Sequence, residues 1–179
     1  MTGPRLYWAL FIAFIAIDQA VKVWARGAMV ESGSIPVPWP GVFELKLVYN
    51  QGVAFGMLQG MGVILAPVAL AIVVFASLHS YKHKEDSPWL HIGLGLLSAG
   101  ALGNLYDRIF HGKVTDMFWI RAIDFPVFNI ADACISVAAV LLVFRLGKEQ
   151  KASPNVEVRS ATSSRDFETP HKEDQSSLL

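Results

Sequence analysis

Aspartates and asparagines recur at the ends of long apolar runs in this chain. The stretch FNIADACISVAAVLLVF begins with Asn129 and Asp132 and then continues without a charge. Residues three apart lie on one face of a helix, so this amide and this carboxylate are expected to be neighbours. A carboxylate at the start of an apolar membrane helix costs several kcal/mol unless it is paired or hydrated. Asp132 is therefore a candidate functional residue.

Other polar pairs occur at the ends of the other apolar runs. Asp18 and Lys22 are four residues apart and can form an ion pair along one helix face. A structural ion pair and a functional pair are equally good interpretations of these two residues. Asn104 and Arg108 are also four apart, and the guanidinium could hold a carboxylate through two hydrogen bonds. Asp116 is placed in the loop that follows.

The sequence excludes several kinds of catalytic site. It contains no HExxH motif and no cluster of histidine and cysteine, so a zinc site has no support. Ser98 lacks the glycine-flanked turn of a serine hydrolase. Cys134 is the only cysteine and lies within an apolar run, as a small buried side chain would. Four of the five histidines lie on loops or singly and are expected to be solvated or interfacial: His79, His83, His91 and His111.

Carboxylates therefore remain as the groups that could do chemistry. Two facing aspartates share one proton, because close like charges cannot both ionise, and one can then activate water while the other protonates a carbonyl oxygen. This chemistry requires no metal and no cofactor. Asp132 is the best single candidate, with Asp116 or Asp107 as its partner. Spacing alone leaves the pair open among five residues: Asp18, Asp107, Asp116, Asp124 and Asp132.

Composition places these residues in a membrane protein. The 179 residues are 53% hydrophobic, with a mean hydropathy of +0.42. The net charge is zero and no run of Lys or Arg is present, which makes nucleic acid an unlikely partner. Charged residues where a signal-peptide cleavage site would lie favour a retained first segment. Four runs approach the roughly 20 residues that cross a bilayer: Leu6–Trp24, Val63–Leu78, Trp89–Leu105 and Phe125–Leu146.

The segment between the first two runs is typical of strands. Within residues 35–57, Phe43–Tyr49 alternates apolar and polar residues with a period of two, as in a half-buried strand. Asn50-Gln51-Gly52 supplies a turn, and Val53–Phe55 could return as a second strand. The predicted fold is therefore an all-α membrane protein with four transmembrane helices and a small β-sheet between helices one and two. The sheet is expected at one membrane surface.

The chain is expected to form one compact domain with a tail. Residues 1–147 contain every apolar run, whereas residues 148–179 are rich in Ser, Glu and Lys and are predicted to be disordered. With four spans, the polar pairs and Asp132 fall on one side of the membrane. The Lys and Arg residues are distributed evenly between the two sides, so charge bias does not decide the topology.

Five motifs occur together in this four-helix chain. They are DQAVK from Asp18, NQGVAF from Asn50, GNLYDR from Gly103, VTD from Val114 and FNIAD from Phe128. In this combination and in this order, over residues 5–147, they resemble the lipoprotein signal peptidase (signal peptidase II) family of bacterial membrane aspartyl proteases.

The resemblance implies a function and assigns site residues. The catalytic pair would be Asp116 and Asp132, in an endopeptidase without metal or cofactor that cuts diacylglyceryl-modified prolipoproteins just before the lipidated cysteine. The enzyme would lie in the bacterial cytoplasmic (inner) membrane, with both termini cytoplasmic and the site facing the periplasm or exterior. A monomer in contact with substrate and membrane lipids is expected. Residues that shape the site or contact substrate would be Asp18, Lys22, Asn50, Gly52, Asn104, Arg108 and Asn129.

Two other functions use the same residues. A small transporter could relay protons or cations through the aspartates. Transporters often contain internal repeats and polar sites near the middle of the membrane, whereas this chain has no visible repeat and its polar residues gather at one surface. A non-catalytic scaffold would use the same groups as structural ion pairs only.

Overall fold

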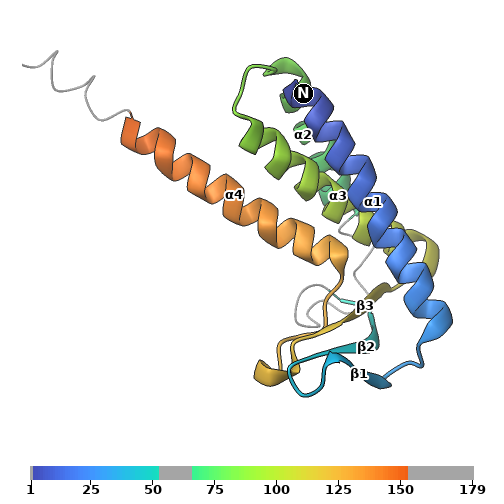
Figure 1. Ribbon diagram of the computed structural model, residues 1–179. Coiled ribbons are helices and arrows are strands. Elements are labelled where there is room, and N and C mark those ends of the chain that lie inside the picture. The colour runs from blue at the N-terminus through green and yellow to red at the C-terminus, as the bar shows by residue number, and fades with distance from the viewer. Residues whose placement is uncertain (1, 53–65, 153–179) are drawn as a thin grey trace, which may run out of the picture. The chain divides into compact units, whose positions relative to one another are not determined.

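A computed structural model describes residues 2–52 and 66–152 of the chain. The chain divides into two units, Met1–Arg145 and Leu146–Leu179. The described part of the first unit contains a bundle of helices at one end and a three-stranded sheet at the other (Figure 1). Of the second unit, the structure describes the end of the last helix, to Ala152. The predicted return strand at Val53–Phe55 and most of the predicted tail lie outside the described residues.

Each of the four predicted apolar runs lies largely within a helix. Proline near the first position of α1 and of α3 fits a helix start, where its missing N–H would have no partner anyway. Helix α3 ends at Gly112, which adopts the left-handed conformation, with φ of +70°, that closes many helices. The helices are α1 (Gly3–Ala28), α2 (Ala66–Lys82), α3 (Pro88–His111) and α4 (Ile130–Ala152), and a short 3₁₀ helix, η3, covers Arg121–Ile123.

Length and hydropathy identify one clear spanning candidate among these helices. Helix α1 has 26 residues, and its most apolar window has a mean hydropathy of 1.6. Helix α2 is apolar but shorter, with 17 residues. No other helix in the described ranges meets both criteria, so these criteria alone do not confirm the four predicted spans.

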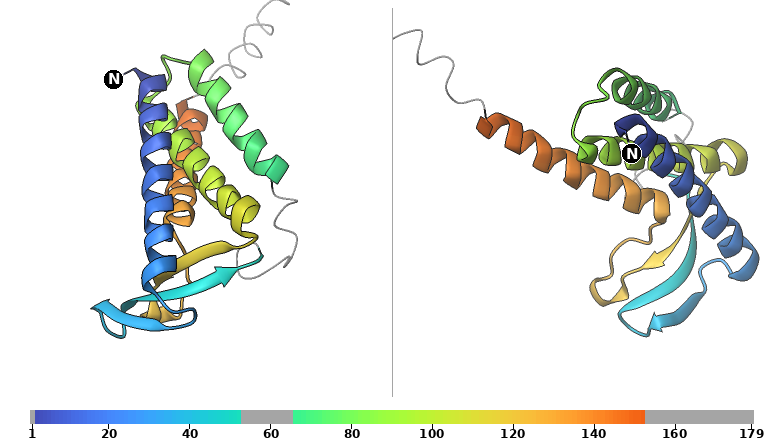
Figure 2. Two further views of the ribbon diagram at one scale, coloured as in Figure 1. Left: turned by 90° about the vertical axis from the view of Figure 1, so that its right-hand side faces the viewer. Right: turned by 45° about the horizontal axis from the view of Figure 1, so that its top comes forward.

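Glycines of α3 bring the neighbouring helices close to it. A Cβ on Gly95 would lie 2.9 Å from the backbone oxygen of Tyr7 in α1. A Cβ on Gly100 would collide with the backbone oxygen of Ala131 in α4. Small residues permit this close approach of backbones, which is a common way to pack helices in membranes. Helix α3 is accordingly the most buried helix of the bundle, between α1 and the start of α4 (Figure 2).

The sheet has the order β1-β2-β3, with both pairs antiparallel. Its strands are β1 (Ser34–Trp39), β2 (Phe43–Asn50) and β3 (Val114–Trp119). The strand predicted at Phe43–Tyr49 is confirmed. The sheet is not confined to the segment between the first two helices, however, because β3 comes from the connection between α3 and α4.

The placement of Asp116 in a loop was therefore wrong. Asp116 lies on β3 and pairs with Val48 of β2. Val114, Thr115 and Trp119 favour extended backbone, but a strand partner more than sixty residues away leaves no local signal in the sequence.

A small apolar core attaches the sheet to the end of α1. Ala25 and Met29 pack there against Leu47 of β2 and Met117 of β3, and all four side chains are buried. Because Leu47 and Met117 hold one face of the sheet against α1, the alternate side chains of β2 and β3 point the other way, toward the start of α4. Asp116 is one of these.

A buried glutamate ties the far end of the sheet together. Glu44 of β2 accepts hydrogen bonds from the Ser34 hydroxyl at 2.6 Å and from the Gly41 backbone N–H at 2.8 Å. Its carboxylate also forms an ion pair with Arg121 of η3 at 2.8 Å. These hydrogen bonds, that from Ser34 first, lower the pKa of Glu44 from 4.5 to about 2.

The sheet is therefore expected to lose stability in acid. The contribution of Glu44 is fully present above pH 4.5 and is lost as the pH falls toward 2, because protonation weakens all three bonds. Thermal unfolding, followed by tryptophan fluorescence, should report this loss in the wild type. Glu44→Gln should start from a lower midpoint and change less over the same window. Glu31→Gln, an exposed control, should follow the wild type, and equal pH dependence in Glu44→Gln would contradict the assignment.

Candidate active site

The first turn of α4 presents Asp132 in a reciprocal cap. Asn129 precedes the helix, and its side-chain oxygen accepts a hydrogen bond from the Asp132 backbone N–H at 2.9 Å. In turn, the Asp132 carboxylate accepts a hydrogen bond from the Asn129 backbone N–H at 3.2 Å. This is the geometry of a capping box, in which two otherwise unpaired N–H groups are satisfied. The predicted contact between Asn129 and Asp132 is thus confirmed.

Helix α1 supports the same turn with a second carboxylate. Asp18 accepts a hydrogen bond from the backbone N–H of Ala131 at 3.0 Å. Gly103 of α3 makes room for it, because a Cβ at that position would lie 2.6 Å from an Asp18 oxygen. The start of α4 is therefore held by Asp18 across 113 residues of sequence as well as by its own cap.

Asn129 also joins Asp132 to Asp116. The Asn129 side-chain N–H₂ donates to Asp116 at 2.7 Å while its backbone N–H donates to Asp132. Asn50 of β2 donates to the other oxygen of Asp116 at 3.3 Å. One asparagine therefore contacts both carboxylates, which come from β3 and α4.

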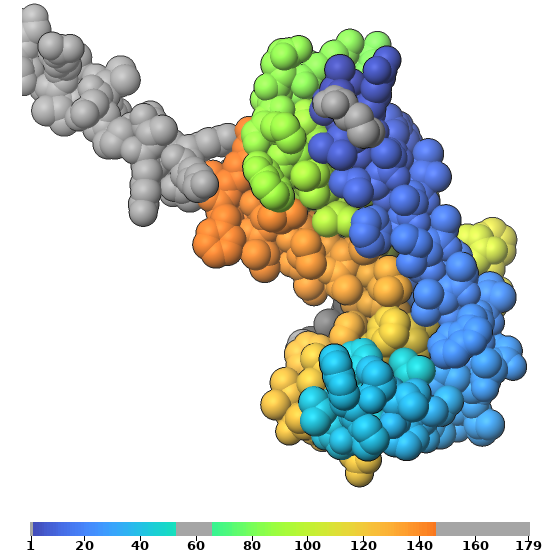
Figure 3. All heavy atoms as spheres, in the orientation of Figure 1, coloured from blue at the N-terminus to red at the C-terminus, as the bar shows by residue number. Residues whose placement is uncertain are grey.

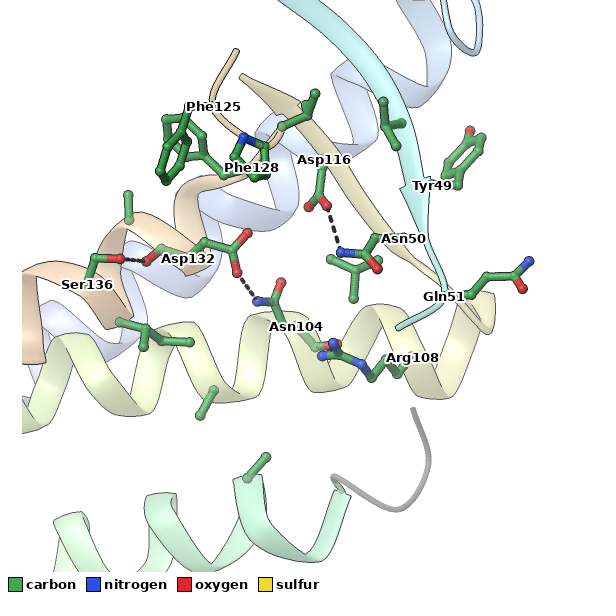
Figure 4. Close-up of a pocket in the computed structure, with 18 of the residues that line it drawn as sticks. Tyr49, Asn50, Gln51, Asn104, Arg108, Asp116, Phe125, Phe128, Asp132 and Ser136 are labelled. Carbon is green, nitrogen blue, oxygen red and sulfur yellow. Dashed lines mark hydrogen bonds between the residues drawn. The ribbon is translucent and has the colours of Figure 1, made fainter. Parts of the chain in front are cut away.

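Asn104 of α3 occupies the centre of the site. Its N–H₂ donates to Asp132 at 2.7 Å (Figure 4). Its side-chain oxygen accepts from Lys22 at 3.0 Å and from Asn129 at 3.0 Å. Because both acceptor directions of the amide oxygen are occupied by donors, the N–H₂ group is fixed toward Asp132.

Beneath Asn104 lies a buried group of charges. The Lys22 ammonium is fully buried, 2.9 Å from Asp18 and 3.5 Å from Asp107. Arg26 contacts Asp107 at 3.5 Å and donates to the hydroxyl of Thr115 in β3 at 2.9 Å. The predicted Asp18–Lys22 pair is confirmed, and it belongs to a network that joins α1, α3 and β3.

The two candidate carboxyls differ in how deeply they are buried. Asp116 is almost completely buried, whereas Asp132 is half-buried. Burial, and after it the negative charge of Asp132, raises the pKa of Asp116 to about 7. Asp116 therefore keeps a proton at a pH at which an ordinary aspartate has lost it.

Both carboxyls line a cavity of about 1290 Å³ (Figure 4). At its polar end, Asn50 and Asn104 accompany the aspartates. Its other walls are mainly apolar side chains of α2, of α4 and of the segment that precedes α4: Val68, Ile72, Phe125, Val127, Phe128, Ile135 and Val137. The cavity can therefore accept a molecule that is polar at one end and apolar along the rest.

Arg108 also lines the cavity but does not grip a carboxylate. It donates to the backbone oxygen of Gly52 at 2.9 Å and to that of Asn104 at 3.3 Å. Gly52 in turn donates its N–H to the side chain of Asn50 at 2.9 Å. A bidentate carboxylate contact was one possibility for Arg108 and an anchoring role was the other; in this structure Arg108 anchors the turn after β2.

The structure brings nearly all the predicted site residues together. Asp107 takes part in the charge network and accepts a hydrogen bond from the Thr115 backbone N–H at 2.8 Å, away from the two candidate carboxyls, and Asp124 is exposed on the loop after η3. Two residues of the charge network, Arg26 and Thr115, were not predicted. Arg26 could have been found, because Asp18, Lys22 and Arg26 recur every four residues and so share one helix face.

A second buried polar cluster lies away from the site. Tyr7 donates to Ser98 at 3.0 Å and also contacts Ser77 at 2.8 Å. His91 is fully buried and is hydrogen-bonded to Ser80 at 2.9 Å. The expectation of a solvated or interfacial His91 was wrong: the ring is buried between helices, and the Ser80 hydroxyl of α2 bonds one of its nitrogens, Nδ1. Across the described ranges, no three His, Cys, Asp or Glu side chains are arranged to bind a metal.

Comparison with known proteins identifies sequence relatives. The family model for signal peptidase II matches residues 10–147. A lipoprotein signal peptidase of Streptococcus pneumoniae is 35% identical over 141 residues, which is 79% of this chain and 92% of the relative. One from Gloeobacter violaceus is 38% identical over 146 residues, covering 81% and 84% of the two chains.

Two solved structures share the fold. Both are described as bacterial membrane enzymes. One, at 25% identity, has a TM-score of 0.77 and covers 84% of this chain and 92% of its own. The other, at 26% identity, has a TM-score of 0.70 and covers 78% and 91%.

Proposed function

The chain belongs to the signal peptidase II family, and we propose that Asp116 and Asp132 are the catalytic pair of this membrane aspartic endopeptidase. Its activity is removal of the signal peptide from diacylglyceryl-modified prolipoproteins, by a cut just before the lipidated cysteine. The observation that carries the assignment of the pair is the double contact of Asn129, which donates to both carboxylates at the polar end of the cavity.

The two carboxyls take different roles in the proposed reaction. Asp132, half-buried and open to the cavity, accepts a proton from the water that attacks the scissile carbonyl carbon. Asp116, which keeps its proton up to a pH of about 7, donates that proton to the carbonyl oxygen. As the tetrahedral intermediate collapses and the C–N bond breaks, Asp132 gives the proton it took from water to the amine nitrogen of the lipidated cysteine. Asp116 takes back the proton of the hydroxyl, which restores both carboxyls to their starting states.

The remaining predicted residues position this pair. Asn104 and Asn129 orient the carboxylates, and Lys22 and Asp18 hold Asn104 and the first turn of α4. Asn50 donates to Asp116. Gly52 and Arg108 shape the entrance after β2. The apolar walls on α2 and α4 suit the acyl chains and the apolar signal peptide, which places the scissile bond beside the polar end.

We propose four spans, with both termini cytoplasmic and the site on the outer side of the cytoplasmic membrane. Exposed aromatic residues lie at both ends of α1 and α3 and at the end of α2, as in the interfacial belts of membrane proteins: Trp8, Tyr81 and Trp89 on one side, and Trp24, Tyr106 and Phe110 on the other. An even number of spans returns the chain to its starting side. Residues 1–147 would be the peptidase domain of a monomer in contact with lipid, with residues 148–179 as a cytoplasmic tail.

A gel-shift assay on a diacylglyceryl-modified prolipoprotein tests the activity. Purified protein in detergent, without added metal, should convert the substrate to a shorter lipidated product and a free signal peptide. The same substrate without the diacylglyceryl group is the control. A well-folded protein that cleaves neither form would contradict the proposed activity.

Cleavage should also depend on pH in a defined way. As the pH rises through about 7, Asp116 ionises and the proton donor is lost. The rate should then fall about tenfold per pH unit. Initial rates at saturating substrate, measured from about pH 4 to about pH 9, test this shape, and an alkaline plateau would contradict Asp116 as the acid.

A further inference from the structure

Two turns meet at the end of the sheet where β1 passes into β2. In the first turn the Val42 N–H donates to the Trp39 oxygen at 3.0 Å. In the second, which contains η3, the Ala122 N–H donates to the Val42 oxygen at 3.2 Å. The ion pair between the exposed Arg121 and the buried carboxylate of Glu44 joins the turns a second time. These contacts therefore hold the two turns together as one rigid unit.

The two linked turns carry three exposed apolar side chains, called here the apolar tip: Trp39, Val42 and Ile123. Their exposed fractions are 65%, 51% and 71%. Within residues 2–52 and 66–145 nothing covers them. Figure 3 shows the two turns side by side, in blue-cyan and gold, at the lower end of the molecule. Side chains of this size rarely stay in water in a group without a partner.

The tip lies away from the helix that carries the sheet. Strand β1 begins at Ser34, shortly after α1 ends, and runs away from α1 to Trp39. Six extended residues span about 17 Å. In Figure 1 the turn after β1 lies on the far side of the sheet from α1. Because the bundle is in the membrane, a sheet that leaves α1 sideways at its outer end brings the tip over lipid.

The edge of the sheet excludes another strand as the partner. Every residue of β1 is exposed, but Pro36 and Pro38 lack the N–H groups that a further strand would need. Arg121, in the second turn, lies 5.5 Å from the ring of Trp119, and Lys46, farther from the tip where β2 pairs with Ser34, lies 4.5 Å from the same ring. Apolar and aromatic tips flanked by such cations are typical of elements that sit in the interfacial layer of a bilayer.

We propose that the apolar tip inserts into the interfacial layer of the outer leaflet and sets the height of Asp116 above the membrane. Strand β3 leads from Asp116 through Trp119 directly into η3 and the tip. A tip fixed in lipid therefore fixes one end of the strand that carries the carboxyl, while the core under Met117 fixes it to α1. The role in cleavage rests on the proposed function of Asp116, whereas insertion of the tip does not.

Spin-label accessibility tests insertion without reference to activity. The full chain, with Cys134→Ala and one added cysteine, would be labelled at position 39, 42 or 123 and reconstituted into vesicles of phosphatidylethanolamine and phosphatidylglycerol. Val140→Cys on the exposed face of α4 is the lipid reference, and Lys84→Cys in the α2–α3 loop is the water reference. Labels on the tip should be more accessible to oxygen than to a water-soluble nickel complex, as at position 140.

Two outcomes would overturn insertion. Labels that match position 84 would place the tip in water. Labels protected from both reagents would indicate that protein, not lipid, covers the tip.

Cleavage in vesicles tests the consequence for Asp116. Trp39→Ser with Ile123→Ser removes most of the apolar surface of the tip and should lower the rate in vesicles by about tenfold. Val30→Ser, at an apolar residue even more exposed but outside the tip, is the matched control and should keep the wild-type rate. Equal rates for both variants would overturn the role in setting the height of Asp116. A wild type inactive in both detergent and vesicles would instead contradict the proposed function, whatever the spin labels report.

Discussion

Asp116→Asn and Asp132→Asn are each expected to lower cleavage by about 10²–10⁴-fold, to the background of the assay. Asparagine keeps the size of the side chain but can neither accept the proton of water nor exchange protons with the substrate. In each variant the reaction therefore loses its base or its acid. Initial rates on the lipidated prolipoprotein, with folding checked by thermal unfolding, measure the effect.

Asp124→Asn is the matched control for this experiment. Asp124 is exposed and has a positive φ of 48°, a conformation that asparagine also adopts readily. The same chemical change there should leave the cleavage rate within about twofold of the wild type, since surface substitutions away from special features have small effects. If either folded variant at position 116 or 132 kept the wild-type rate, the assignment of the pair would be wrong.

Lys22→Met is expected to have the largest effect on stability, a loss of about 3–5 kcal/mol in the free energy of unfolding. The substitution keeps the length of the side chain but leaves Asp18 and Asp107 buried without their shared cation. Arg26 still contacts Asp107, so the uncompensated charge falls mainly on Asp18. Unfolding of the detergent-solubilised protein in denaturant measures the loss.

Two variants separate this effect from the loss of any lysine. Lys82→Met, on the exposed end of α2, should change stability by less than about 0.5 kcal/mol. Adding Asp18→Asn to Lys22→Met should recover part of the loss, because the neutral amide needs no cation. A stable Lys22→Met protein would mean that the buried network is hydrated or weakly coupled, and would contradict the role given to Lys22.

The sequence contained the local parts of this site but not their assembly. The contact between Asn129 and Asp132 and the pair of Asp18 and Lys22 follow from helix periodicity, and both were predicted. The start of α4 beside Asn129 was predicted too, from the polar residues that open the helix, although the apolar run itself begins at Phe125.

Contacts between distant segments could not be predicted from the sequence for a different reason. The pairing of Asp116 with Val48 depends on how β3 returns from α3, and nothing near Asp116 encodes its partner. The resemblance to a family supplied Asp116 as a catalytic residue, where spacing had left five aspartates open. The acceptor of the Arg108 guanidinium could not be predicted either, because the sequence gives the reach of this side chain but not which acceptor lies within it.

The cap of α4 also links catalysis to local unfolding. Asn129 closes the helix and contacts both carboxylates, so fraying of that single turn would separate Asp116 from Asp132 at the same moment. The fraction of molecules able to react is then set by the opening equilibrium of one helical turn. The Asp132 amide, which is bonded within the cap, exchanges its hydrogen with solvent only when that turn opens. Its exchange rate would therefore measure how often this turn opens and the two carboxyls separate.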